Sequence, residues 1–373
     1  MRARPLVVAI AIAATSMGCT PAWGEAYLHA VATGTRAYHA GRYLEAAQAY
    51  HDAAAKALRA KDRDEARFLE ARMLERAGRH GDAIAVYEAI AQSSPTGQRT
   101  ERVRFLAAES KIDHGNATTG WKELEAAIEA MPGSGNARAA LDRLLSRVAA
   151  EGGDEAVVAW LAAHQKRFAP TELDQTVTYE RAGALDRLGR LDEARDAYLA
   201  AARAHPYPHG SLTDDCYWRA ADAEVRQGRY AQAIALLNEM LAPLETSGNP
   251  GSYERPRFPA AQQRIAEIYR DHLKDRAAAR REYHRLYEEH RATILRDDAL
   301  WNEARLARED RDDRAACDVM ARLVKEFPTS RYARCTRELC ASAPAPKQEC
   351  AGYLVRQLAR PAGSPEPDDE ASR

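Results

Sequence analysis

The chain has 373 residues, which is more than one compact core usually holds, so it should form several domains or an array of repeats. Its 54 Lys and Arg residues balance 55 Asp and Glu residues, which argues against a nucleic-acid-binding protein that relies on a strongly positive field. Hydrophobic residues make up 46% of the chain, but much of this is alanine, and aromatic residues make up only 7%. This composition favours closely packed helices, and the alternating pattern of strands is almost absent after the first residues.

The first residues have the pattern of a targeting segment. Arg2 and Arg4 supply a positive end, and the apolar run at 6–14 is too short for an ordinary membrane span. The run leads to Gly-Cys at Cys19, which resembles the lipobox of bacterial lipoproteins, where the cysteine is lipidated and becomes the mature N-terminus. We therefore expect residues 1–18 to be a signal peptide.

The cleavage site has two interpretations. The lipobox usually has leucine where this chain has Ser16, so the alternative is an ordinary secretion signal that is cut near Ala22 or Gly24. Both interpretations predict export. Thr20 follows Cys19, and no Asp is present there to indicate retention in the inner membrane. The lipobox resemblance therefore implies an outer-membrane anchor that faces the periplasm.

Small or slim residues recur along most of the chain at intervals of 36 to 46 residues, and we call them the anchors: Ala46, Ala83, Gly120, Val158, Ala194, Ala233, Ala279 and Ala316. The residues four and seven positions after each anchor are apolar, with Gln165 as the single exception. This spacing predicts the buried stripe of a helix that crosses its predecessor at the anchor.

Turn residues flank these helices. Five positions before the anchors stand Gly41, Gly78, Gly115, Gly153, Gly189 and Gly228, followed by Lys274 and Arg311. Glycine there supplies the left-handed conformation that ends a preceding helix. Twelve positions after five of the anchors stand Pro95, Pro132, Pro170, Pro206 and Pro328. Each proline should end the second helix of its repeat.

This frame resembles the tetratricopeptide repeat, with GRYLEAAQAYHDA, GRHGDAIAVYEAI, GRLDEARDAYLAA and GRYAQAIALLNEM as the best matches. The resemblance covers roughly residues 27–332. It implies an all-α, right-handed, TPR-like α-solenoid of about eight helical hairpins, with repeats 1–6 at 27–242 and repeats 7–8 at 260–332.

Three segments interrupt or follow the repeats. The segment at 243–259 is rich in turn residues, and it is either a hinge between two blocks or a surface insertion. Residues 333–360 contain cysteines and should form a C-terminal capping segment, which a solenoid needs because its last repeat otherwise exposes apolar surface. The composition of residues 361–373 predicts a disordered tail.

The cysteines of the C-terminal region form an even cluster: Cys317, Cys335, Cys340 and Cys350. In an oxidising compartment such a cluster predicts disulfides, and four cysteines allow three pairings. We favour Cys317 with Cys335 and Cys340 with Cys350. Zinc is the rival, but no pair has the C-x-x-C spacing. Cys216 is left over, and we expect it to be a small buried hydrophobic residue.

No catalytic motif is recognisable, and we expect no enzyme activity, cofactor or metal site. His284 and Glu288 are four residues apart and could share a metal, but a charged pair on a solvated helix face is the interpretation we adopt. His205 and His209 flank a turn and are interpreted as incidental.

The candidate binding residues come from one column, fifteen positions before the anchors: Val31, Phe68, Phe105, Arg143, Tyr179, Trp218, Arg264 and Trp301. The repeat resemblance implies that this position faces the concave groove that holds peptides. The preceding column is largely polar, so the alternative is that these helices are rotated and the aromatic residues lie in the core.

We expect Phe68 and Phe105 to be in the core. Trp218 and Trp301 are the stronger candidates for the groove, because Tyr217 and Leu300 beside them can take the core role. The full set of expected groove residues is Trp218, Trp301, Tyr179, Arg143 and Arg264.

The resemblance therefore implies a non-enzymatic scaffold or adaptor of the bacterial cell envelope that holds a protein or peptide in its groove. The phrase EFPTSRYA at 326–333 resembles envelope lipoproteins of the barrel-assembly type and coordinators that work beside the Tol–Pal system. The alternatives are a helical accessory of peptidoglycan-processing enzymes, similar to the superhelix of lytic transglycosylases, and a self-assembling structural protein. We expect no nucleic-acid partner, and membrane contact only through the candidate N-terminal lipid.

Overall fold

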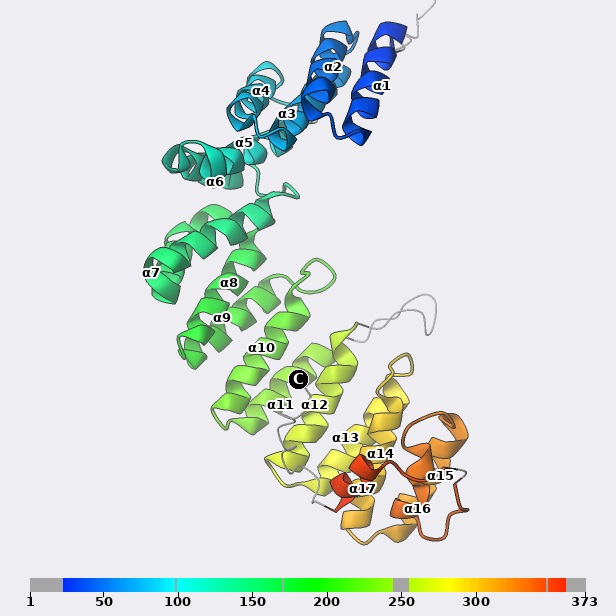
Figure 1. The fold of residues 1–373 in the computed structure, drawn as a ribbon. Coiled ribbons are helices and arrows are strands. Elements are labelled where there is room, and N and C mark those ends of the chain that lie inside the picture. The colour runs from blue at the N-terminus through cyan, green and yellow to red at the C-terminus, as the bar shows by residue number, and fades with distance from the viewer. Residues whose placement is uncertain (1–22, 98, 170, 244–254, 347, 360–373) are drawn as a thin grey trace, which may run out of the picture. The chain divides into compact units, whose positions relative to one another are not determined.

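A computed structural model describes residues 23–97, 99–169, 171–243, 255–346 and 348–359 (Figure 1). The expected signal peptide at 1–18, the lipidation candidate Cys19 and the tail at 361–373 lie outside these residues. Seventeen α-helices and one 3-10 helix make up the described part of the chain, and no strand occurs in it. None of these helices is both long enough and apolar enough to span a membrane.

The chain divides into two compact units, which meet in sequence at Ser146 and Arg147. The helices of the first unit pair in order along the chain, each with the next. They are α1 (Glu25–His39), α2 (Tyr43–Lys56), α3 (Ala60–Arg76), α4 (His80–Ser93), α5 (Thr100–His114) and α6 (Ala117–Ala130). The helical segment α7 (Ala137–Phe168) begins in this unit and is broken into two arms at Gly153, whose φ is 69°.

Each hairpin consists of a first helix and a second helix, and the second unit continues this alternation. It contains α8 (Asp174–Arg187), α9 (Leu191–Ala204), α10 (Thr213–Arg226), α11 (Tyr230–Leu241), α12 (Arg257–Asp271), α13 (Arg276–Glu289), α14 (Arg296–Glu309) and α15 (Asp313–Glu326). A capping segment follows, with a 3-10 turn (Ala333–Cys335), α16 (Thr336–Leu339) and α17 (Gly352–Leu358). With the two arms of α7, the helices make the eight hairpins that the repeat spacing predicts.

The turns inside the hairpins follow the glycine column. Five of its six glycines have a φ between 69° and 74°, and the two non-glycine members, Lys274 and Arg311, are left-handed too, with φ values of 55° and 62°. The amide that follows the turn residue bonds back to the first helix, as Arg190 does to the carbonyl of Leu185. Gly115 is the exception, because its φ is −136°.

The second helices end two residues before a proline where one is present. Thus α4 ends at Ser93 before Pro95, and α15 ends at Glu326 before Pro328. The intervening residue leaves the helical region because the ring of a following proline excludes that conformation. Pro170 lies outside the described residues.

The anchors lie where the two helices of a hairpin cross. Ala46, Ala194 and Ala279 have no exposed surface, in agreement with the predicted stripe. At Gly120 the helices α5 and α6 come closest, since a Cβ built there would lie 2.7 Å from the Ile112 nitrogen. Only glycine fits this crossing without a shift of the backbone.

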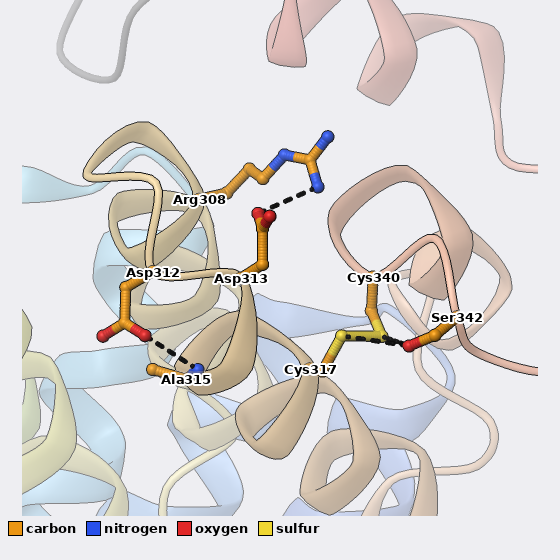
Figure 2. Close-up of a disulfide and its surroundings, with 7 residues drawn as sticks. All are labelled: Arg308, Asp312, Asp313, Ala315, Cys317, Cys340 and Ser342. Atoms are coloured by element: carbon orange, nitrogen blue, oxygen red, sulfur yellow. Dashed lines mark hydrogen bonds and ion pairs between the residues drawn. A yellow bond between two sulfur atoms is a disulfide. The ribbon is translucent and has the colours of Figure 1, made fainter.

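The predicted disulfide pairing is wrong, although all four cysteines are bonded. Cys317 pairs with Cys340, and Cys335 pairs with Cys350. Figure 2 shows the first bond, with the Ser342 hydroxyl 3.3 Å from the Cys340 sulfur.

The course of the capping segment explains this pairing. The 3-10 turn buries Cys335 completely in the cluster that contains residues of α14 and α15, whereas Cys317 on α15 is half-buried. The chain then passes through α16 and returns to Cys317 only at Cys340. The two bonds therefore interleave and fasten both halves of the capping segment. Cys216 is unpaired and buried, as predicted.

The loop predicted at 243–259 ends before residue 259, because a helix begins inside its predicted range. Residues 244–254 lie outside the described part, and α12 begins at Arg257. Pro259 is therefore in the first turn of a helix, where its missing N–H leaves no helical bond unmade. The choice between a hinge and a surface insertion stays a prediction.

Candidate protein-binding surface

The expected column of aromatic residues divides into buried and surface members. Phe68 and Phe105 are 5% and 1% exposed, so the core interpretation is confirmed for both. The polar residues beside them, Arg67 and Arg104, leave the core position to the phenylalanines.

The expectation for Trp301 is wrong, because this side chain is only 2% exposed. Its ring stacks on Tyr332 at a centroid distance of 4.7 Å, in a cluster with Leu339 and Leu354 of the capping segment. Leu300 is buried as well, so both neighbouring side chains lie in the core and Leu300 does not free Trp301 for the groove. The physical reason is that α14 is covered by its neighbouring helices and by the capping segment.

Arg143 lies in the first unit and has its own partners there. Its guanidinium pairs with Asp113 and lies 5.7 Å from the ring of Trp121. The other expected groove residues, Tyr179, Trp218 and Arg264, lie in the second unit on the successive first helices α8, α10 and α12.

The carboxylate of Asp215 joins these three helices. Its oxygens accept hydrogen bonds from the Tyr179 hydroxyl of α8 and from the Arg257 guanidinium of α12. Arg219, one turn further along α10, lies 3.6 Å away. The Asp215 side chain is 17% exposed, so these interactions are only partly screened by water. Burial and this carboxylate together raise the pKa of Tyr179 to about 12, so the phenol remains a donor.

Trp218 lies one turn from Asp215 and is half-buried. The Arg257 guanidinium is 5.6 Å from its ring, a cation–π contact. Trp218 lines a cavity of about 10 Å³ together with Ala221, Asp222, Val225, Leu237 and Arg264. Arg264 pairs with Asp222 at 3.9 Å and with Glu267 at 3.8 Å.

These contacts define one surface, which we call the first-helix surface. Its members are Tyr179, Asp215, Trp218, Arg219, Asp222, Arg257 and Arg264. The surface contains three guanidinium groups, two carboxylates, one indole and one phenol. Tryptophan, tyrosine and arginine are the side chains that most often anchor protein–protein interfaces, so the surface has the composition of a partner-binding site.

Sequence reasoning missed Asp215 and Arg257. Asp214 and Asp215 have the spacing of ordinary acidic residues in the first turn of a helix, and Arg257 belongs to the predicted loop. In the structure the tandem aspartates hold this returning segment. Asp214 pairs with Arg255, which lies between Tyr207 and Phe258, 4.3 and 4.5 Å from their ring centroids. No periodic signal in the sequence connects the two segments.

Two of the histidines singled out in the sequence, His205 and His284, have structural partners. His284 contacts Glu303 of α14 at 3.2 Å rather than Glu288. His205 contacts Asp174 of α8 at 2.7 Å. Both histidines therefore link a second helix to a neighbouring first helix.

Comparison with protein families identifies tetratricopeptide repeats in three parts of the chain. One repeat family matches residues 31–97 and 179–247, and a second matches residues 298–330. No curated protein matches this sequence significantly.

Among solved structures, one described as the functional characterisation of Pseudomonas aeruginosa pilF is similar to this chain. The two sequences are 19% identical, the match covers 62% of this chain and 93% of that chain, and the TM-score is 0.34. A tetratricopeptide repeat protein from Parabacteroides merdae is 11% identical over 75% of this chain and 99% of that chain, with a TM-score of 0.32. The helical hairpins and the family matches together show an all-α protein with a TPR-like solenoid fold, which carries tetratricopeptide repeats at residues 31–97, 179–247 and 298–330.

Proposed function

We propose that this protein is a non-enzymatic scaffold that binds a protein partner on the first-helix surface of its second unit. Tetratricopeptide repeat proteins generally mediate protein–protein interactions. The observation that carries the proposal is the convergence of Tyr179, Trp218 and Arg257 around Asp215 on three successive helices.

The surface has features that define the partner's chemistry. Trp218 is half-buried and offers an apolar face beside Arg257. Arg219 is exposed, and its contact with Asp215 is long at 3.6 Å, so it can turn to a second acceptor. The partner segment should therefore place an apolar side chain against Trp218 and a carboxylate or carbonyl oxygen near Arg219.

We also propose that the protein works in the bacterial cell envelope, as a periplasmic lipoprotein of the outer membrane anchored at Cys19. The two disulfides of the capping segment support this location, because disulfides persist in oxidising compartments. Replacement of Cys19 by alanine tests the anchor. We expect the variant to move from the membrane fraction to the soluble periplasmic fraction, and an unchanged distribution contradicts the lipid anchor.

The binding site is tested by photo-crosslinking in cells. A benzophenone amino acid at position 218 should give a discrete protein adduct. Position 160 is the matched control, because Trp160 is also half-buried but lies on α7 and stacks on His164 at 3.9 Å. Equal adducts from both positions, or none from position 218, contradict the proposal.

A further inference from the structure

A second candidate site lies in the first unit, on the side of the hairpins that the second helices form. A groove of about 450 Å³ runs over α5 between α4 and α6. Its volume is in the range of ligand-binding clefts. The floor is apolar and buried, with Val103 fully buried and Ala107 5% exposed. The walls consist largely of small residues, namely Ala91, Ala126, Ala127 and Ala130.

One end of the groove is fixed by a charged bridge. The Lys111 ammonium of α5 contacts Glu88 of α4 at 2.5 Å and Glu123 of α6 at 2.7 Å. The Lys111 side chain is only 14% exposed, so the bridge is partly shielded from water. It holds the two second helices at a defined separation, and both carboxylates line the groove.

In a later repeat, the position that corresponds to this groove lies over α10, between α9 and α11. There the protein's own side chains fill it. Tyr217 donates a hydrogen bond to Glu239 of α11 at 2.8 Å, and Arg203 of α9 pairs with Glu239 at 2.9 Å. In the repeat frame, the position of Tyr217 corresponds to Arg104 on α5, and that of Glu239 corresponds to Ala126 on α6. Arg104 is exposed, and alanine cannot reach across the groove.

A tyrosine also fills the place between α13 and α15, although it comes from a different helix. Tyr287 of α13 donates to Glu326 of α15 at 2.6 Å, and Arg322 covers its ring at 5.4 Å. The corresponding residues of the open groove are Ala91 for Tyr287 and Ala130 for Glu326. In two repeats, therefore, a tyrosine closes a groove that is open over α5.

From this we infer that the groove over α5 binds an aromatic side chain, tyrosine or phenylalanine, that a helix of a partner protein presents. The internal tyrosines show that an aromatic ring suits this position between two second helices. Glu88 and Glu123 can accept the hydrogen bond of a phenol, as Glu239 and Glu326 do elsewhere. An aromatic side chain that enters a preformed apolar pocket is a typical interface anchor. This site is independent of the first-helix surface.

The test uses a displayed library of amphipathic helical peptides, selected on the full mature chain. Ala91→Tyr copies the residue that closes the groove at α13, and Ala85→Tyr is the matched control because Ala85 is exposed on α4 and does not line the groove. We expect selected peptides to share one aromatic residue. Their Kd should rise about tenfold or more with Ala91→Tyr or when the aromatic residue becomes alanine, and it should stay within about twofold with Ala85→Tyr.

Circular dichroism checks that each variant is folded, and Ala126→Phe, from the opposite wall, replaces Ala91→Tyr if the latter unfolds. The inference is overturned if no peptide is enriched, if the enriched peptides lack an aromatic residue, or if they bind the groove-filling variant as tightly as the unchanged protein.

Discussion

Arg257, the first residue of α12, donates a hydrogen bond to the carboxylate of Asp215 on α10, 42 residues earlier in the chain. Together with the pair of Asp214 and Arg255, this contact fixes the segment at 255–257 to a helix of the preceding hairpin. It also places a guanidinium next to the Trp218 ring. The proposed binding surface therefore depends on one carboxylate for its geometry.

Asp215→Asn should weaken this arrangement. The amide keeps the shape of the side chain but removes the charge that Arg257 and Arg219 share, and a partly buried guanidinium is left without its counter-ion. We expect a loss of about 1–3 kcal/mol in the free energy of unfolding. Asp196→Asn is the control, because Asp196 pairs with Arg195 on the surface and its side chain is 67% exposed. Urea unfolding should show a change of less than about 1 kcal/mol there, and equal losses contradict the account.

The left-handed conformation of the turn residues predicts that one substitution stabilises the protein. Arg311 has a φ of 62°, a conformation that is strained for a residue with a Cβ. Arg311→Gly should raise the free energy of unfolding by about 1 kcal/mol, because glycine adopts this conformation without strain. Gly189→Ala, at the equivalent turn with a φ of 74°, should lower it by a similar amount. Shifts of the urea midpoint in the opposite directions would show that the turns do not control hairpin stability.

The close crossing at Gly120 predicts a steric effect. A methyl group there would lie 2.8 Å from the Ala108 carbonyl oxygen, so α5 and α6 must move apart. We expect Gly120→Ala to cost about 1–3 kcal/mol, as overpacked cores do. Gly135→Ala is the matched control, since an added Cβ at Gly135 meets nothing within 4 Å. Thermal unfolding followed by circular dichroism compares the two, and similar midpoints would contradict the close crossing.

The capping segment should protect Trp301. Replacing Cys335 and Cys350 with serine removes a bond that closes a loop of 15 residues, which costs about 3 kcal/mol in the chain-entropy account. The capping segment then loosens and water reaches the indole of Trp301. Acrylamide should quench tryptophan fluorescence more strongly in this variant, and the excess should vanish when Trp301 is also replaced by phenylalanine. Unchanged quenching would show that packing alone holds the segment.

The raised pKa of Tyr179 predicts alkaline sensitivity. Its pKa is about 12 in the folded protein and about 10 when unfolded, so the folded state holds the proton more tightly. The stability that this group contributes is complete below pH 10 and is lost as the pH rises through 12. The difference in unfolding midpoint between the unchanged protein and Tyr179→Phe should therefore shrink over this interval. A constant difference would mean that the phenol proton does not matter.

Local constraints explain why the hairpins could be predicted from the sequence. A glycine such as Gly189 fixes a left-handed turn, a proline such as Pro328 excludes a helix at the residue before it, and an anchor such as Ala194 must be small where helices cross. Each constraint acts over a few residues and repeats along the chain, so its spacing is visible without any knowledge of long-range contacts.

The site could be predicted only in part, because its members depend on segments that do not follow the repeat. Trp218 and Trp301 occupy the same column, yet the capping segment buries only Trp301. The disulfide pairing depends on how that segment returns to α15. Arg257 reaches Asp215 only because the chain after residues 244–254 comes back to α10. None of these segments follows the repeat spacing, so the sequence pattern does not indicate where they pack.

The most direct test of the proposed function is the affinity of the partner identified by crosslinking, measured with purified proteins by titration calorimetry. If the first-helix surface holds the partner, Trp218→Ala should raise the Kd about tenfold or more, while Trp160→Ala leaves it within about twofold and both variants keep the helicity of the unchanged protein. An unchanged Kd for Trp218→Ala, or an equal loss for Trp160→Ala, would contradict the assignment of binding to this surface.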